Sequence, residues 1–401
     1  MKNEFLTNPI INTLDCNVAV SAGAGSGKTT SLAWRYVYTL KHHLQQGRKL
    51  DLGNILCITF TRMAALEMRE RVRSYLQEEV AETPELQTYL DNFEHAQIVT
   101  MDSLQGKILR EHPVEAGVDP QYVVTDPAEY QVLMESFVRR FLRDKVAFKD
   151  EHLLNLMGAY EPRKIRDALL THEPLTIADS GDDYAALQTD FDGFADKQKR
   201  NRDILSYGDV HRRCLELLRN CPEVRHHYQK QYRYIMVDEF QDTDDGQQEL
   251  VYLLCQDPKD LQNLGKELCG KKLFVVGDKK QSIYRFRGAQ VSLFEEVQKT
   301  IKDGGGEVFS MTTNYRSTDK ILNLTNHVFD QDFMFKKDGF EALSPAPQNM
   351  ESPKQSTRWP VMKFFTGENL SGKWFEKRKW LLEQEAAEVA KRIQSLAQDG
   401  M

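Results

Sequence analysis

Short, uninterrupted runs of hydrophobic residues recur along the N-terminal part of the chain. Five of them are rich in β-branched residues and too uniformly apolar for a sheet with a solvated face: Val18 to Ser21, Ile55 to Phe60, Ile98 to Thr100, Tyr234 to Val237 and Leu273 to Gly277. Such runs are typical of buried parallel strands. Stretches of helical composition, such as Thr29 to Leu44 and Arg62 to Glu79, lie between them. The alternation predicts an α/β fold with a doubly wound parallel sheet.

A long region without such runs separates the third run from the fourth. From about Leu104 to Ser206, Pro, Asp and Glu alternate with helical stretches such as Glu129 to Asp144. This pattern indicates a largely helical insertion between two strands of the sheet.

The pattern changes again after Gly304, Gly305 and Gly306. A further strand, Glu307 to Met311, leads into a helix that ends near Asp330, and we expect a second α/β lobe to begin there. Residues 331–358 have the composition of a linker, and Gln384 to Ala397 has a helical period. The expected domains are a discontinuous sheet domain (1–105 and 206–305), a helical insertion (106–205) and a partial second lobe with linker (306–401).

Composition agrees with a folded protein of more than one domain. The chain has 401 residues, of which 40% are hydrophobic and 28% charged, as in ordinary globular proteins. It has no apolar run long enough for a membrane span, and its N-terminus lacks a signal pattern, so a cytoplasmic protein is expected. Its six cysteines form no CxxC pair, and neither a disulfide framework nor a zinc site is expected.

The overall charge does not indicate a nucleic-acid partner, because 53 basic residues stand against 60 acidic ones. Any such contact must therefore be local. Each of three basic clusters is either a contact site or, more commonly, a solvated helix face. The clusters are Arg139, Arg140, Arg143 and Lys145; Lys197, Lys199, Arg200 and Arg202; and Lys279, Lys280, Arg285 and Arg287.

A glycine-rich segment follows the first run and opens the first helix, which is the context of a phosphate-binding P-loop. Small residues there let backbone N–H groups surround phosphate oxygens. Lys28 is expected to reach the β- and γ-phosphates and Thr29 to bind Mg²⁺. The alternative is a glycine-rich turn with an exposed lysine. The segment is Ala22, Gly23, Ala24, Gly25, Ser26, Gly27, Lys28 and Thr29.

Two carboxylates stand at the end of the fourth run. Beside a P-loop, Asp238 is expected to hold Mg²⁺, and Glu239 to orient or deprotonate the water that attacks the γ-phosphate. The alternative is an acidic strand end that is merely solvated.

A third cluster, Gly277 to Gly288, interleaves cations with aromatic residues after the fifth run. Tyr284 and Phe286 can stack on bases while arginines meet phosphates, which favours single-stranded nucleic acid. The alternative is that both aromatic rings pack in the core.

With these clusters in this order, the chain resembles the UvrD/Rep-like superfamily 1 DNA helicases over nearly its whole length. Gly117 to Pro120 and the long insertion resemble the AddA and RecB branch, the motor subunits of recombination helicase-nucleases. The resemblance implies a RecA-like P-loop NTPase domain, ATP and Mg²⁺ as cofactors, movement from 3′ to 5′ on single-stranded DNA in recombination or repair, and a helicase-nuclease partner subunit. Supporting segments are Thr59 to Ala65, Thr100 to Ser103, Ser206 to Asp209 and Asn314 to Ser317.

The resemblance also implies residue roles. Gln281 senses the γ-phosphate, Arg316 supplies a cation to it, and Tyr315 stacks on adenine. Thr30 joins the nucleotide contacts, although it replaces a frequent arginine. The single strand is expected to contact Phe60, Thr61, Arg62, Thr100, Tyr284, Phe286 and Arg287.

The sequence ends before the later motifs of the family, including a second arginine of the ATP site. We therefore expect an N-terminal portion of a helicase that alone binds Mg-ATP and single-stranded DNA weakly and does not unwind a duplex. One alternative is a non-catalytic module that binds nucleotide or DNA and regulates a partner. A P-loop NTPase acting on another substrate is disfavoured by the cluster Gly277 to Gly288.

Overall fold

The computed structural model describes residues 8–173, 175, 181–257, 268, 270–283, 290–329 and 341–350. All of them belong to one compact unit, Met1–Met350. Tyr284, Phe286, Arg287 and the expected helix Gln384 to Ala397 lie outside the described residues.

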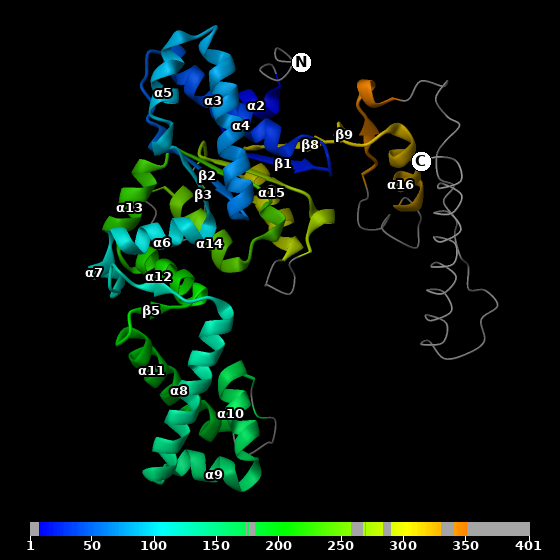
Figure 1. Cartoon of the computed structure of the whole chain (residues 1–401). Coiled ribbons are helices and arrows are strands. Elements are labelled where there is room, and N and C mark those ends of the chain that lie inside the picture. Colours follow the sequence, from blue (N-terminus) through cyan, green and yellow to red (C-terminus); the bar gives the residue numbers. More distant parts are fainter. Residues whose placement is uncertain are drawn as a thin grey trace, which may run out of the picture. The chain divides into compact units, whose positions relative to one another are not determined.

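A sheet of six parallel strands organises this unit, in the order β3-β2-β6-β7-β1-β8 (Figure 1). Every pairing in it is parallel, which confirms the doubly wound α/β fold. The strands are β1 (Val18–Ala22), β2 (Ile55–Thr59), β3 (Gln97–Thr100), β6 (Tyr234–Val237), β7 (Leu273–Gly277) and β8 (Glu307–Met311).

Helices cover both faces of the sheet because its strands are apolar on both faces (Figure 1). In β1, Val18 and Val20 join one hydrophobic core, while Ala19 joins the other. The first core lies under α3 (Lys28–Gln45), α4 (Arg62–Val80) and α5 (Gln87–Asp91). The second lies under α6 (Met101–Glu111), α12 (Tyr207–Asn220), α13 (Pro222–Gln231), α14 (Asp245–Cys255) and α15 (Val291–Asp303).

Strand β8 corrects the expected start of the second lobe. Glu307 to Met311 pairs in parallel with β1, from Val18 opposite Glu307 to Ala22 opposite Met311, and so completes the first sheet. The turn at Gly304 to Gly306 returns the chain from α15 to this edge, where the N–H of Glu307 donates to the Asn17 carbonyl. Beyond β8 the structure describes β9 (Thr313–Asn314), α16 (Asp319–Phe329) and β10 (Ser344–Pro345), and β10 pairs with β9.

The expected insertion includes the end of α6 and α7 (Pro113–Ala116), both of which contact α12 of the sheet domain. Its other four described helices are α8 (Pro127–Ala147), α9 (Glu151–Ala159), α10 (Pro162–Thr171) and α11 (Gly181–Arg200). They share a hydrophobic core of their own, which includes Phe141, Leu156 and Phe191. Two short paired strands, β4 (Val123–Val124) and β5 (Ile204–Leu205), stand where the chain enters and leaves this bundle. The other helical segments in the described part of the chain are α2 (Pro9–Asn12) and the 3-10 turns Leu52–Asn54, Pro84–Leu86, Phe93–His95, Phe240–Asp242, Lys279–Gln281 and Pro347–Asn349.

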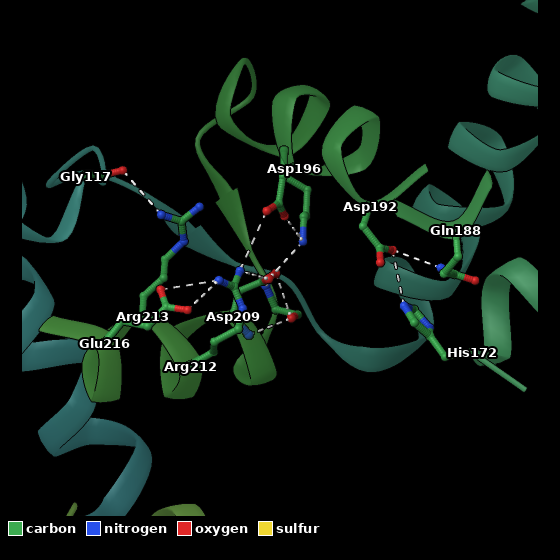
Figure 2. Close-up of polar contacts among 11 residues, drawn as sticks. Gly117, His172, Gln188, Asp192, Asp196, Asp209, Arg212, Arg213 and Glu216 are labelled. Atoms are coloured by element: carbon green, nitrogen blue, oxygen red, sulfur yellow. Dashed lines mark hydrogen bonds and ion pairs between the residues drawn. The ribbon is translucent and has the colours of Figure 1, made fainter. Parts of the chain in front are cut away.

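A buried ion pair joins the bundle to α12 (Figure 2). Lys199 at the end of α11 donates to Asp209 at 2.8 Å, and the side chains of both residues are about nine-tenths buried. Asp209 also accepts hydrogen bonds from the backbone N–H and the hydroxyl of Ser206, which form a capping box at the start of α12. Lys199 of the second basic cluster therefore belongs to a structural ion pair.

Candidate nucleotide-binding site

The predicted site residues come from different parts of the sequence, yet those that are described follow the carboxyl ends of strands of one parallel sheet. Ligands of such sheets bind at this edge, because the loops that leave parallel strands all emerge there. The P-loop follows β1, Asp238 and Glu239 follow β6, Gln281 follows β7, and Tyr315 and Arg316 follow β8 and β9.

The P-loop has the backbone that its glycines allow. Gly25 and Gly27 have φ angles of +70° and +89°, in the left-handed region that side chains disfavour. Gly27 caps α3, so the free N–H groups of the first helical turn face the loop. The hydroxyl of Ser26 is buried and has no hydrogen-bond partner among the described residues. The loop is thus shaped to receive phosphate oxygens.

Lys28 contacts the expected general base directly. Its Nζ lies 2.6 Å from Oε2 of Glu239, and Lys28 is 9% exposed. Glu239 itself has a φ of +50°, an uncommon value for a residue with a side chain, and such strain gathers at functional sites. The ion pair shows that the lysine and the glutamate reach the same point of the site.

The carboxyl groups beside Glu239 are hard to ionise. Burial, followed by the charge of Glu239, raises the pKa of Asp238 to about 7. The same two causes, in the same order, raise the pKa of Asp242 to about 6. A cation bound beside these carboxyl groups would offset both causes and favour their charged forms.

Gln241 connects the two acidic strand ends. Its Nε2 donates to Glu239 at 2.9 Å, and its Oε1 accepts the N–H of Asp278 at 2.8 Å. Asp278 in turn accepts a hydrogen bond of 2.7 Å from Gln281. A chain of hydrogen bonds thus connects Gln281 through Asp278 and Gln241 to Glu239, and Gln241 is a link that the sequence did not identify.

The segment after β9 is fastened to the P-loop by Asn314, which is 2% exposed. Its Nδ2 donates to the carbonyl of Ala24 at 2.6 Å, and its Oδ1 accepts the N–H groups of Arg316 and Ser317. The N–H of Tyr315 also donates to the carbonyl of Gly25. A Cβ at Gly25 would lie 2.8 Å from Asn314 and Arg316, so only glycine allows this approach.

These elements enclose a cavity of about 320 Å³. Most of the residues predicted to bind nucleotide line it together, whereas Ala22 to Ala24 support the loop, and Asp238 lies buried behind it. The lining residues are Gly25, Ser26, Gly27, Lys28, Thr29, Thr30, Glu67, Arg71, Glu239, Gln281, Tyr315 and Arg316.

Sequence analysis missed two of these lining residues, Glu67 and Arg71 of α4. Arg71 donates to Thr30 at 3.1 Å and to Glu67 at 2.6 Å. Their spacing of four residues, which places both side chains on one helix face, was the available signal. Arg71 thus brings a guanidinium to Thr30, the position at which the family frequently has an arginine.

The predicted DNA contacts divide into two groups. Phe60, Thr61 and Arg62 follow β2, and Thr100 ends the neighbouring strand β3, so these four share one edge of the sheet. Thr61 caps α4 and Thr100 caps α6, each by accepting an N–H three residues later. The structure does not test Tyr284, Phe286 and Arg287, which lie outside the described residues.

Comparison with known proteins gives consistent results. The UvrD/REP helicase N-terminal domain family matches residues 4–302. Proteins named ATP-dependent DNA helicase PcrA are 30% identical in Staphylococcus aureus, over 79% of this chain and 38% of the relative, and 30% identical in Leuconostoc citreum, over 82% and 40%. The PcrA of Staphylococcus epidermidis is 28% identical over 79% and 38%. The chain spans about two fifths of the length of these relatives.

None of the helices in the described part of the chain combines the length and the hydropathy of a membrane span.

Proposed function

The chain belongs to the UvrD/REP helicase family, and on this premise we propose that it forms the ATP-binding part of an ATP-dependent DNA helicase. The observation that carries the proposal is the cavity in which Lys28, Glu239, Gln281 and Arg316 meet. A P-loop lysine, a carboxylate for the attacking water and cations for the γ-phosphate are the groups that ATP hydrolysis requires.

Each of these residues has a role in the proposed hydrolysis of ATP. The backbone N–H groups around Gly25 to Thr29 receive the β- and γ-phosphates, and Lys28 turns from Glu239 to them. Glu239 is then free to orient and deprotonate water, while Arg316 neutralises charge that develops on the γ-phosphate. Tyr315 provides an aromatic face for the adenine base.

The residues present also fit Mg²⁺. Asp238 is 7% exposed and burial raises its pKa, so a cation bound beside it would favour its charged form. Thr29 lines the nucleotide cavity with its hydroxyl-bearing side chain. Mg²⁺ needs few protein ligands beside nucleotide phosphates, and Asp238 and Thr29 would hold it. When bound, it neutralises charge on the transferred phosphoryl group.

DNA is expected at the ends of β2 and β3, next to the nucleotide cavity. We propose that Phe60 stacks on a base and that Arg62 meets the backbone of a single strand. Movement from 3′ to 5′, a role in recombination or repair, a helicase-nuclease partner, the closer resemblance to AddA and RecB, and a cytoplasmic location all remain predictions. The divisions between domains at residues 105 and 205 remain predictions too.

The first prediction separates nucleotide binding from hydrolysis. Lys28→Ala should weaken Mg-ATP binding at least tenfold, because it removes the cation from the P-loop. Glu239→Gln should keep binding and lose the hydrolysis that the wild type shows. Binding is measured with a fluorescent ATP analogue and hydrolysis by phosphate release, with and without single-stranded DNA. Equal affinity in the wild type and Lys28→Ala would refute the P-loop assignment, whereas binding without turnover in the wild type would favour the regulatory module.

The second prediction concerns the strand contact. Phe60→Ala should weaken the binding of an oligothymidylate by about 1–3 kcal/mol, the usual contribution of one stacked base. Val114→Ala is the matched control, since Val114 is 87% exposed and lies on α7. The measurement is fluorescence anisotropy at low salt. Equal affinities of Phe60→Ala and the wild type would show that this ring packs without touching DNA.

A further inference from the structure

A second cavity, of about 120 Å³, lies where the helical insertion joins the sheet domain. Its walls come from both connections of the insertion: Gly117 to Tyr122 before β4, and Lys199 to Leu205 around β5. The last wall is Arg213, which lies on α12. The nucleotide site does not use this cavity.

Arg213 is the unusual member of this cavity. It is 8% exposed, and its NH1 group makes one long hydrogen bond, of 3.4 Å, to the Gly117 carbonyl (Figure 2). Its Nε is buried and has no acceptor among the described residues. A buried guanidinium with one weak acceptor costs several kcal/mol unless an anion accompanies it.

The carboxylates near Arg213 do not form ion pairs with it. Asp209 pairs with Lys199 and Arg212, and Arg212 also pairs with Glu216. Within the described part of the chain, no carboxylate lies within 4.0 Å of Arg213 or of Arg200. Burial, followed by the positive charges of Arg200 and Arg212, lowers the pKa of Arg213.

The size of the cavity restricts its ligand. At about 120 Å³ it has room for a tetrahedral oxyanion. Guanidinium groups bind phosphate through paired N–H donors. The rim also carries two exposed carboxylates, Asp119 and Asp203, and Lys199 is already paired with Asp209, so the two cations Arg200 and Arg213 face two anions. This balance disfavours an ion of high charge and admits a single phosphate group.

We propose that this cavity binds one phosphate group, free or in a DNA backbone, between Arg213 and Arg200. The phosphate would contact the end of α11 through Arg200 and the sheet domain through Arg213 of α12, and so would fix the bundle to the sheet domain. The proposal is independent of the ATP site and does not require helicase activity.

The test measures thermal unfolding of the full chain in sodium phosphate and in sodium chloride of equal ionic strength. All variants carry Lys28→Ala, so that phosphate at the P-loop does not contribute. Phosphate at about ten times its Kd should raise the Tm by about 2 °C with Arg213 present. Arg213→Met should abolish this rise, and Arg212→Met, which removes the neighbouring surface cation, should retain it. Arg200→Gln, at the exposed rim, should reduce the rise even if Arg213→Met does not fold.

The same Tm in phosphate and chloride with Arg213 intact would overturn the proposal, and so would an equal rise with and without Arg213. A second arm distinguishes the two sources of phosphate. If the ligand is a DNA phosphate, Arg213→Met alone should weaken oligonucleotide binding and reduce its salt dependence by about one counterion. If the ligand is free phosphate, oligonucleotide affinity should be the same with and without Arg213.

Discussion

The ionisation of the buried Asp238 side chain destabilises the folded state. Its carboxyl group is buried at the end of β6, and burial together with the charge of Glu239 raises its pKa to about 7. The folded state therefore holds a proton that the unfolded chain has released above pH 4. The contribution of Asp238 to the free energy of unfolding therefore falls as the pH rises from about 4 to 7, and it is constant above pH 7.

The third prediction follows from this loss of stability as the pH rises. In the absence of nucleotide and Mg²⁺, Asp238→Asn should stabilise the chain, and the gain should be about 2 kcal/mol larger at pH 8 than at pH 5. Urea unfolding at both pH values measures it. Asp303→Asn, at an exposed helix end, is the control and should show no such difference. A gain that is equal at both pH values would contradict the raised pKa.

At the scale of elements, α4 connects the two candidate sites. Thr61 caps its N-terminus beside the expected DNA contacts, and Arg71 reaches the nucleotide cavity about three turns later. A helix is rigid over this distance, so we expect a shift of α4 toward a bound nucleotide to move its DNA-facing end as well. Residues that carry such coupling typically change it by 0.5–2 kcal/mol when replaced.

The fourth prediction tests this helix. Arg71→Ala should reduce the factor by which single-stranded DNA stimulates ATP hydrolysis by about tenfold, within the range of such couplings. Arg73→Ala, an exposed arginine two residues further along α4, is the matched control. Steady-state ATPase rates over a range of oligonucleotide concentrations give the factor. An unchanged factor, with unchanged ATP affinity, would show that Arg71 only stabilises α4.

At the scale of the whole molecule, the buried pair Lys199–Asp209 holds the insertion to the sheet domain. Burial opposes the charge of Asp209, but hydrogen bonds from Lys199 and Ser206 outweigh it and lower the pKa of Asp209. The contribution of Asp209 to stability is thus fully present above the ordinary pKa of an aspartate, about 4. It is lost as the pH falls through the lowered pKa of Asp209.

The fifth prediction concerns this joint. Asp209→Asn should destabilise the chain by about 3–5 kcal/mol at pH 7, because it leaves the Lys199 ammonium buried without its main partner. Glu216→Gln, which removes a half-exposed pair with Arg212, should cost less than about 1 kcal/mol. Urea unfolding and limited proteolysis between α11 and α12 measure the two variants. Similar losses for both would show that the joint does not depend on Lys199–Asp209.

The local structure of this protein could be predicted from its sequence alone. Buried parallel strands are apolar on both faces, and a P-loop needs glycine at Gly25 and Gly27, so both are encoded in residues that are adjacent in the chain. The expected bounds of five strands differ from those of the structure by one residue at most. The ordering of motifs was sufficient to identify the helicase family.

The contacts between segments that are distant in sequence depend on the tertiary fold and could not be predicted. Strand β8 joins the first sheet because its backbone pairs with β1, and no pattern within Glu307 to Met311 specifies that partner. Arg71 enters the nucleotide cavity because α4 packs on α3. Arg213 is buried on α12, and no carboxylate of the described residues lies within 4.0 Å of it. A strand or a loop is specified by residues close in sequence. Pairing, burial and charge balance depend on which surfaces come together, and that is decided by the fold as a whole.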